Sequence, residues 1–166
     1  MNEKIILVDE NDKEIGEKEK QQTHIDGNLH RCFSIQIFNS NGEQLLQKRA
    51  NHKYHSGGLW TNACCGHPRP GEDTKIAAKR RLKEELGIDC ELHEKTIFAY
   101  RAEFSNRLTE NEIDHLFTGF TDKNPILNPE EAEEYKWISK EELKEDIESH
   151  PENYTIWFQI ITQKTL

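Results

Sequence analysis

Long apolar runs are missing from this sequence, and so is any segment suited to export. No apolar run approaches the roughly 18 residues that a membrane-spanning helix requires. The opening residues, MNEKIILVDENDKEIG, lack the basic start, apolar stretch and small-residue cleavage site of a signal peptide. No repeat, linker or low-complexity tract divides the 166 residues. We therefore expect a cytoplasmic protein with no membrane partner, folded as one domain over residues 1–166.

Positive charge is also in short supply. The chain has 22 lysine and arginine residues against 31 aspartate and glutamate residues, which gives a net charge of -9. Nucleic acids and membrane surfaces attract proteins with basic surfaces, so neither is an expected partner. A small anionic substrate is compatible with this charge, provided that basic side chains gather locally.

Cysteines paired as C-x-x-C are absent. The four cysteines are Cys32, Cys64, Cys65 and Cys90, and none has the spacing of a structural zinc knuckle. A disulfide between the adjacent Cys64 and Cys65 would be strained, and the cytosol disfavours disulfides. The ordinary interpretation of each cysteine is a small buried hydrophobic residue.

Alternating apolar residues predict several strands. Two hairpins are expected over residues 4–17 and 31–49, the second with the turn signal Asn41-Gly42. Further strands are expected over residues 59–66, 96–104, 111–121 and 133–139.

Three segments have helical patterns, over residues 72–86, 140–149 and 153–163. The supporting positions are the apolar stripe Ala78, Leu82 and Leu86 with the cap Gly87, the capping box Ser139 and Glu142, and the docking candidates Ile156, Ile160 and Ile161. The mixture of hairpins and helices predicts an α+β fold, with helices packed against a mixed sheet.

The first of these helices is unusually rich in charge. From Gly66 the chain follows the pattern G-x5-E-x7-R-R-L-x-E-E-L-G-I, which ends at Ile88. A solvated helix face with an Arg81–Glu85 ion pair would explain it. Alternatively, Glu84 and Glu85 hold a hard cation such as Mg²⁺ near Arg81, so that a phosphate meets the metal there.

The spacing of this segment resembles the Nudix box. The box usually has Arg-Glu where this chain has Arg80-Arg81. In Nudix hydrolases that glutamate helps to bind Mg²⁺ or to activate water, so its replacement disfavours hydrolysis. An arginine at this position is better suited to holding a phosphate. The resemblance implies a Nudix-like fold, in which a mixed β-sheet lies between α-helices.

The stretch TNACCGHP places two thiols close to a histidine. Side chains alternate along a regular strand, which puts Ala63, Cys65 and His67 on one face. Cys64 then points to the opposite face. We expect Cys65 and His67 to look into one site, and Cys64 to pack in the core.

Two glutamates, Glu110 and Glu112, lie in the stretch TENEID. They face the same way if their strand is regular, although an exposed strand end would also explain them. Upstream, His24 and His30 have the ordinary interpretation of surface or loop histidines. If these four side chains met His67 in space, three histidines and two carboxylates would form a site for a divalent metal.

Several segments together resemble the type 1 isopentenyl-diphosphate isomerases. The most specific are T-N-x-x-C-x-H-P from Thr61 and E-N-E from Glu110, and LHRCFSIQIFN, LLQKR and RRLKEELGI support them. The resemblance covers about residues 3–160. It implies an enzyme of isoprenoid precursor biosynthesis that interconverts isopentenyl diphosphate and dimethylallyl diphosphate. A proton is added at one carbon and another is removed two carbons away, through a tertiary carbocation.

The resemblance also assigns roles to individual residues. Cys65 is the implied catalytic thiol, Glu112 the catalytic carboxylate, and Tyr100 the residue that assists this carboxylate. The implied ligands of one divalent metal, Mn²⁺, Mg²⁺ or Zn²⁺, are His24, His30, His67, Glu110 and Glu112. Glu85 would hold a second ion, Mg²⁺, that bridges to the diphosphate. The implied substrate-binding residues are Lys20, Arg49, Lys53, Arg81 and Trp157.

Two other functions fit part of the sequence. A Nudix pyrophosphohydrolase would use Glu84, Glu85 and Mg²⁺, but it leaves the thiol of Cys65 and the E-N-E motif unexplained. A Nudix-fold module that only senses a diphosphate would need neither of them. We therefore favour the isomerase, as either a monomer or a homodimer.

The remaining histidines and one acidic run have the ordinary interpretation. Residues 128–136 are expected to form a solvated loop that leads into a strand. The histidines outside the motifs, which are given no role, are His52, His55, His93, His115 and His150.

Overall fold

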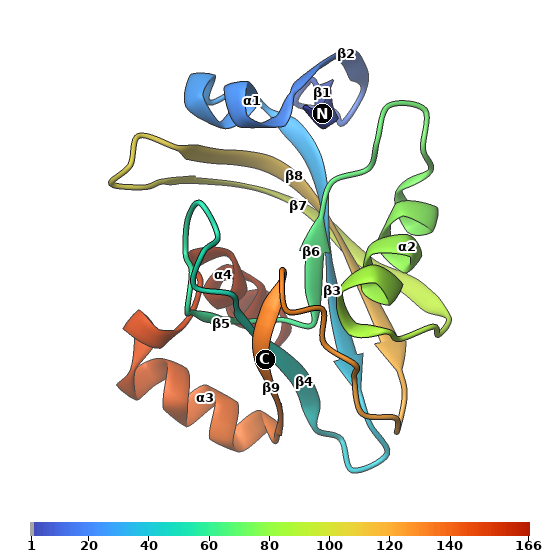
Figure 1. Cartoon of the computed structure of the whole chain (residues 1–166), viewed down its shortest axis with the longest axis vertical. Helices are drawn as coiled ribbons and strands as arrows, with labels where there is room; N and C mark the ends of the chain where they lie inside the picture. The colour runs from blue at the N-terminus through green and yellow to red at the C-terminus, as the bar shows by residue number, and fades with distance from the viewer. Residues whose placement is uncertain (1) are drawn as a thin grey trace.

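The computed structural model describes residues 2–166 and has the α+β architecture expected from the sequence. A mixed sheet forms the centre, and helices lie on both of its faces (Figure 1). The strands are β1 (Lys4–Val8), β2 (Glu14–Glu19), β3 (His30–Phe38), β4 (Gln44–Arg49), β5 (Trp60–Thr61), β6 (Cys64–Gly66), β7 (Leu92–Glu103), β8 (Thr109–Phe120) and β9 (Ala132–Ile138). The helices are α1 (Lys20–Asp26), α2 (Thr74–Leu86), α3 (Lys140–Ser149) and α4 (Ile156–Thr165), with a 3₁₀ turn, Pro151–Asn153, before α4.

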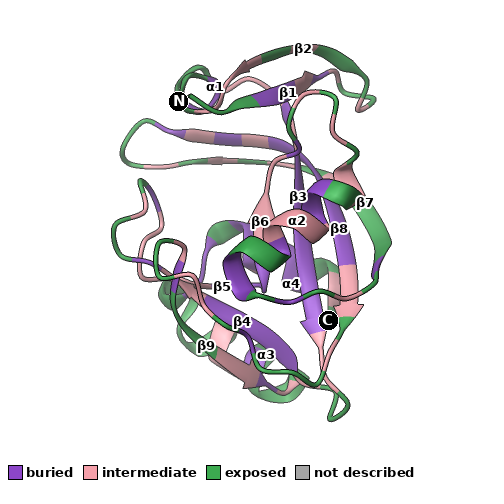
Figure 2. Ribbon diagram, turned by 45° about the vertical axis from the view of Figure 1, so that its right-hand side comes forward, coloured by how far each residue is buried: buried purple, intermediate pink, exposed green. Residues whose placement is uncertain are grey.

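Two apolar clusters, one on each face, hold the helices against the sheet. The first packs the predicted stripe of α2, Ala78, Leu82 and Leu86, against β3 and β4. The second packs α3 and α4 against β4 and β8. Adjacent side chains of β4 alternate between the faces, so Leu45 joins the first cluster and Leu46 the second. The buried residues accordingly follow β3, β4 and β8 (purple in Figure 2).

The parallel pair of β3 and β8 runs through the middle of the sheet. Its register places His30 beside Glu112. β7 pairs with the other edge of β8 in the antiparallel direction, with Tyr100 opposite Glu112. Glu112 therefore has a histidine on one neighbouring strand and a tyrosine on the other.

The two predicted hairpins differ in extent. β1 and β2 pair along their length, which confirms the first hairpin. The second is present at its turn, where Phe38 pairs with Gln44, and its strands then separate. Beyond that point β3 pairs with β6 and β8, whereas β4 pairs with β5 and β9. The chain after β4 must therefore cross from one part of the sheet to the other.

The strand expected around the paired cysteines is interrupted at this crossing. The side-chain amide of Asn62 donates to the carbonyl oxygens of Ile35, at 3.0 Å, and of Cys64, at 2.8 Å. These bonds replace the regular ladder between β5 and β6. The predicted alternation is therefore wrong, because Ala63 and Cys64 both pack in the cluster beneath α2. Cys65 contacts the opposite cluster, so the two thiols do lie in different surroundings.

Helix α1 has no counterpart in the sequence-based expectation. It is short, and its buried residues are Thr23 and His24, so it has no apolar stripe to reveal it. The carboxylate of Glu19 caps its start by accepting from two backbone N–H groups, and Gly27 ends it with a φ of 70°. The two caps fix the helix so that the His24 side chain points inward.

Helices α2 and α3 follow the sequence closely. α2 begins after the N-cap Asp73 and ends at Gly87, which has the left-handed conformation expected of a C-terminal cap, with a φ of 64°. In α3 the capping box of Ser139 and Glu142 is present as expected.

Helix α4 is present, but its docking face differs from the expected one. Trp157, Phe158 and Ile161 are buried, whereas Ile156 is 41% exposed and Ile160 is half-buried. Ile156 is the first helical residue after the N-cap Thr155, and the two aromatic side chains that follow it fill the interface instead. In the described residues, no helix has both the length and the apolar character needed to cross a membrane.

Candidate active site

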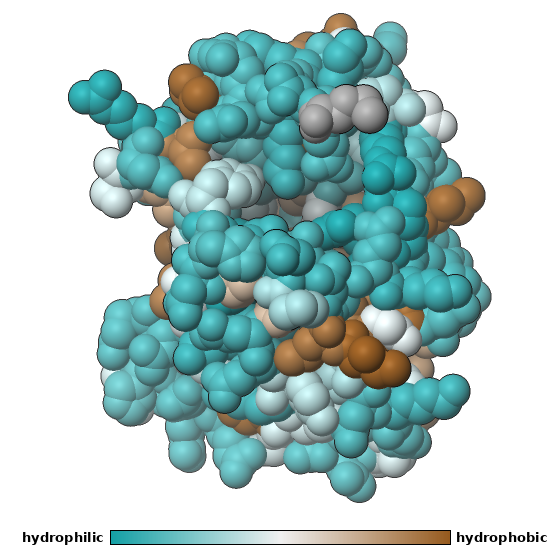
Figure 3. Space-filling model, in the orientation of Figure 1, coloured by the Kyte–Doolittle hydropathy of each residue, from teal (hydrophilic) through white to brown (hydrophobic). Residues whose placement is uncertain are grey.

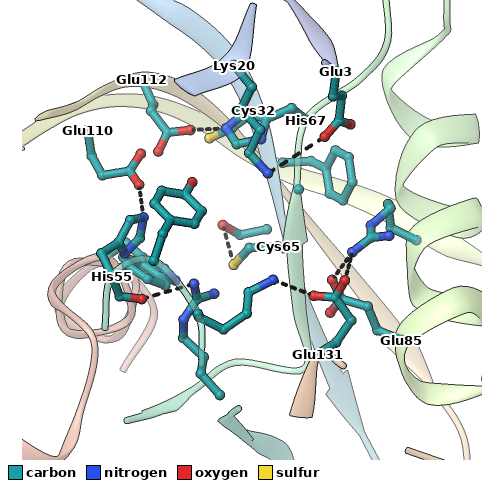
Figure 4. A pocket seen from close by; sticks show the side chains of 18 of the residues that line it. Glu3, Lys20, Cys32, His55, Cys65, His67, Glu85, Glu110, Glu112 and Glu131 are labelled. Atoms are coloured by element: carbon teal, nitrogen blue, oxygen red, sulfur yellow. Dashed lines mark hydrogen bonds and ion pairs between the residues drawn. The ribbon is translucent and has the colours of Figure 1, made fainter. Parts of the chain in front are cut away.

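A pocket of about 170 Å³ lies among β3, β6, β8, α2 and the loop that follows β4. The face seen in Figure 3 is mainly hydrophilic and has a hollow in its upper half. All the predicted catalytic and substrate-binding residues line the pocket. These are Lys20, Arg49, Lys53, Cys65, Arg81, Tyr100, Glu112 and Trp157. Figure 4 shows Glu110 and Glu112 at one end, Glu85 and Glu131 at the other, and Cys65 between them.

Four of the five predicted metal ligands converge at the first end. The side chains of His24, His30, His67 and Glu112 offer ligand atoms that all lie within 4.8 Å of one another. They come from α1, the start of β3, the segment after β6 and the start of β8. The fifth predicted ligand, Glu110, lies at the edge of this group, with Oε2 at 3.3 Å from His24 Nε2.

Backbone contacts set the tautomers of two of these histidines. Nδ1 of His24 lies 2.8 Å from the carbonyl oxygen of Lys20, and Nδ1 of His30 lies 2.9 Å from that of Asn28. A carbonyl only accepts, so each Nδ1 carries the proton, and in the neutral ring Nε2 presents a lone pair.

Those lone pairs face carboxylates. His30 Nε2 lies 3.3 Å from Oε2 of Glu112, and the two Nε2 atoms and Oε2 of Glu110 have no hydrogen-bond partner in the described chain. Facing lone pairs repel unless a proton or a metal cation lies between them. This donor set, imidazole with carboxylate, therefore fits a divalent metal ion.

Burial and neighbouring charges shift the pKa values of the cluster. Burial lowers the pKa of His67 to about 4, which keeps its ring neutral, as a metal ligand must be. Burial also opposes charge on His30, but the adjacent Glu112 outweighs it and raises the pKa of His30. For Glu112, burial would raise the pKa, but the adjacent Glu110, His30 and His67 side chains outweigh burial and hold it well below its usual range.

Two protonated groups face the space beside this cluster. The hydroxyl of Tyr100 donates to Oε1 of Glu112 at 2.7 Å, and burial holds the pKa of Tyr100 well above its usual value. The thiol of Cys65 lies 3.3 Å from Oδ1 of Asn62 and 3.5 Å from Oγ of Ser34. Burial raises the pKa of Cys65 to about 12, so sulfur holds its proton at neutral pH.

One buried acid behind the thiol was not singled out from the sequence. Ser34 Oγ donates to Oδ2 of Asp114 at 2.6 Å, and burial raises the pKa of Asp114 to about 7. The signal was available, because Asp114 continues the alternation of Glu110 and Glu112 along β8. Cys64, by contrast, is fully buried away from the pocket, as expected.

Three of the basic pocket residues have an acidic partner, Lys53 and Arg81 at the second end and Lys20 beside the histidine cluster, whereas Arg49 has none among the described residues. Arg81 lies 2.6 Å from Oε1 of Glu85, which is the predicted ion pair, and 3.1 Å from Glu131. Lys53 Nζ lies 2.7 Å from Oε2 of Glu131, and Lys20 lies 3.7 Å from Glu3. A diphosphate would meet these cations already paired.

The carboxylates at this end differ in exposure. Glu85 is buried, and the side chain of Gln47 donates to its Oε2 at 3.0 Å. Glu84, the second candidate for Mg²⁺, is exposed and pairs with Arg80 and Arg81. Glu131 corrects the expectation for the acidic run, because it faces the pocket rather than solvent.

Two of the histidines that were given no role make definite contacts. His115 lies between Asp12 and Glu94, at 2.7 Å from each, outside the pocket. His55 lines the pocket, and its Nε2 lies 2.9 Å from Oε1 of Glu110. The sequence holds no local signal for either, because these partners lie far away along the chain.

The fold and the box together define a NUDIX-fold protein. A NUDIX domain matches residues 28–158. A solved structure from Deinococcus radiodurans is similar with a TM-score of 0.74, at 20% identity over 89% of this chain and 90% of that one.

Curated relatives identify the family within the NUDIX-fold proteins. Isopentenyl-diphosphate Delta-isomerase 1 of Aromatoleum aromaticum is 50% identical over 100% of this chain and 94% of its own length. Isopentenyl-diphosphate Delta-isomerase 2 of Photorhabdus laumondii is 50% identical over 97% of this chain and 91% of its own length. The chain therefore belongs to the isopentenyl-diphosphate Delta-isomerase family, which confirms the resemblance found in its motifs.

Proposed function

We propose that this chain interconverts isopentenyl diphosphate and dimethylallyl diphosphate by moving protons between the enzyme and two carbons of the substrate. The observation that carries the proposal is the pocket itself. Its walls hold the Tyr100–Glu112 pair, the Cys65 thiol and a group of basic side chains. Its relatives carry this reaction in their names.

Two groups supply the proton transfers. In the forward direction Glu112, assisted by Tyr100, gives a proton to the terminal alkene carbon, and Cys65 takes one from the carbon two positions away. The return reaction exchanges these roles. Burial raises the pKa of Cys65, which keeps a proton on sulfur at neutral pH. That state is ready for the return reaction, with the thiol as acid and Glu112 as base.

The histidine cluster supports the use of a divalent metal. We propose that His24, His30, His67, Glu110 and Glu112 hold Mn²⁺, Mg²⁺ or Zn²⁺, and that Glu85 holds a Mg²⁺ ion that arrives with the diphosphate. The first ion would fix the Glu112 carboxylate and tune its acidity. The unpartnered Nε2 atoms of His24 and His30 support this assignment.

Different pocket residues suit the two ends of the substrate, basic side chains the diphosphate and an aromatic ring the alkene. Lys20, Arg49, Lys53 and Arg81 supply cations for the diphosphate, against the net charge of the chain, -9. The ring of Trp157 already has the Arg49 guanidinium 5.2 Å from its centre. A ring face that attracts one cation is suited to stabilise the carbocation, by about 2 kcal/mol when water is excluded.

The domain organisation, the localisation and the partners are inferred from the composition of the sequence. We propose that residues 1–166 act as one domain in the cytoplasm, with a small isoprenoid diphosphate as substrate. The acidic charge supports the absence of nucleic-acid and membrane partners.

The test is nuclear magnetic resonance of the purified protein with isopentenyl diphosphate and Mg²⁺ in D₂O, with proton and phosphorus signals followed together. We expect dimethylallyl diphosphate that carries deuterium, with no phosphate released. Cys65→Ala should abolish turnover, whereas the matched Cys64→Ala should retain it and lose stability. Released phosphate would identify a hydrolase, and an unchanged substrate in a folded, metal-loaded sample would leave only a binding module.

A further inference from the structure

His55 makes four contacts that join residues around the pocket, three through its ring and one through its backbone. Its Nε2 lies 2.9 Å from Oε1 of Glu110. Its ring stacks on Phe104, with ring centres 4.8 Å apart and planes at 11°. Its ring also meets Trp157 edge to face, at 5.6 Å and 83°. The backbone carbonyl of His55 accepts from Arg49 at 3.3 Å.

The loop that carries His55 is held in one shape. Ser56 and Gly58 have left-handed backbone conformations, with φ of 55° and 78°. A Cβ atom on Gly57 would lie 2.6 Å from the carbonyl oxygen of Asn51, so only glycine fits there. The tight turn directs His55 inward, and 8% of the residue is exposed.

The two carboxylate oxygens of Glu110 have different surroundings. One carboxylate oxygen, Oε1, lies 2.9 Å from Nε2 of His55. When Nδ1 of His55 accepts from Ser56 Oγ, at 3.2 Å, Nε2 carries the ring proton and is placed to donate to Oε1. The other oxygen, Oε2, has no hydrogen-bond partner among residues 2–166 and faces Nε2 of His24 at 3.3 Å. A carboxylate held by one oxygen keeps the other aimed in a fixed direction.

We propose that His55 is a positioning residue, which holds Glu110 so that its free oxygen faces the histidine cluster. The proposal rests on the metal site described under the proposed function and adds to it a residue outside the predicted ligand set. The donor atom of His55 orients the metal ligand, and the ring of His55 supports Trp157 on the opposite side. The two contributions are separable by substitution.

Two variants separate the donor from the ring. His55→Phe keeps a ring of similar size against Phe104 and Trp157 but removes the hydrogen bond to Glu110. His55→Gln keeps a donor near the position of Nε2 but removes the ring. His52, three residues earlier, supplies the matched control, since His52→Phe changes a side chain that is 58% exposed.

The measurement is the dissociation constant for Mn²⁺ alone, from the signal of free Mn²⁺ in electron paramagnetic resonance. We expect His55→Phe to weaken Mn²⁺ binding by about 10- to 100-fold, the range for groups that orient a metal ligand. His55→Gln should recover most of the affinity, and His52→Phe should bind as the wild type does. A merely structural role would not produce this order, because His55→Gln disturbs the packing more.

Three outcomes would overturn the proposal. If His55→Phe binds Mn²⁺ as tightly as the wild type, the hydrogen bond does not orient Glu110. If His55→Gln binds as weakly as His55→Phe, packing rather than the donor is responsible. If the wild type itself binds no Mn²⁺, the metal site of the proposed function fails together with this inference. The first two outcomes leave the proposed function intact.

Discussion

At one end of the pocket, buried histidines and carboxylates meet with atoms that have no partner in the described chain, Nε2 of His24 and His30 among them. At the other end, Lys53 and Arg81 are both paired with Glu131. The first end is nearly closed to solvent, whereas the second is only partly buried.

The two ends of the pocket are therefore suited to bind their ligands in different ways. The histidine end gathers buried donor atoms that suit a divalent cation, so under the proposed function its ion is expected to stay bound. At the basic end Lys53 and Arg81 are paired with Glu131, so the proposed diphosphate would have to compete with Glu131 for them. Binding there is correspondingly reversible.

The largest effect is expected from the histidine end. His30→Gln removes a buried ligand atom, and the Mn²⁺ dissociation constant should rise by more than about 100-fold, with turnover lost. The matched control is His93→Gln, at an exposed position of β7. Equal Mn²⁺ affinity in His30→Gln and wild type would show that this end binds no ion through His30.

A smaller effect is expected at the basic end. Arg81→Glu reverses a charge in the pocket wall that we propose contacts the diphosphate, and the KM should rise by about 30-fold while Mn²⁺ affinity is retained. Lys83→Glu makes the same charge change at an exposed position of the same helix and should leave KM unchanged. Steady-state kinetics checks both, and an unchanged KM in Arg81→Glu would remove Arg81 from the substrate site.

If Glu131 competes with the diphosphate for Lys53 and Arg81, removing its charge should lower the KM. Glu131→Gln removes the anion that competes for Lys53 and Arg81, and the KM should fall by about fivefold, the range of one partly exposed ion pair. Glu130→Gln is the control, because Glu130 is exposed and lies outside the pocket. A higher KM in Glu131→Gln would mean that Glu131 arranges the two cations for the substrate instead of competing with it.

The smallest effect is expected on stability, from the ion pair between Arg80 of α2 and Glu72. Arg80 donates to both oxygens of Glu72, at 2.8 and 2.9 Å, and this lowers the pKa of Glu72. A lowered folded-state pKa gives stability that is present above the unfolded value and is lost as the pH falls through the folded value. Glu72→Gln should therefore reduce the free energy of unfolding by about 0.5 kcal/mol at pH 7.

Urea unfolding at two pH values checks this prediction. The difference between Glu72→Gln and wild type should shrink as the pH falls through the folded-state pKa of Glu72, below which both states are protonated. A difference that persists at low pH would assign the effect to packing and not to the charge.

The sequence predicted best where the information is local. Helix α2 has its stripe, its N-cap and Gly87 within one segment, and the structure follows it closely. The interruption at Asn62 could not be predicted, because its amide bonds to Ile35, a residue of another strand. Helix α1 was missed because a short helix without an apolar stripe has no periodicity to detect.

The same distinction holds for the candidate site. The motifs indicated Cys65 and the E-N-E glutamates, and the parallel register of β3 and β8 explains how His30 meets Glu112. His55 and Glu131 were given ordinary interpretations because their partners are distant in sequence. Their positions depend on how loops close over the sheet, which alternation and spacing do not encode.

The parallel pairing of β3 and β8 also sets an order of events during synthesis. His24 and His30 leave the ribosome well before Glu112, and parallel strands join only after the intervening chain has formed its crossover. The proposed metal site therefore cannot be complete until β8 has emerged and paired. Before that point the nascent chain could offer an ion only histidines, and afterwards it offers the Glu112 carboxylate as well.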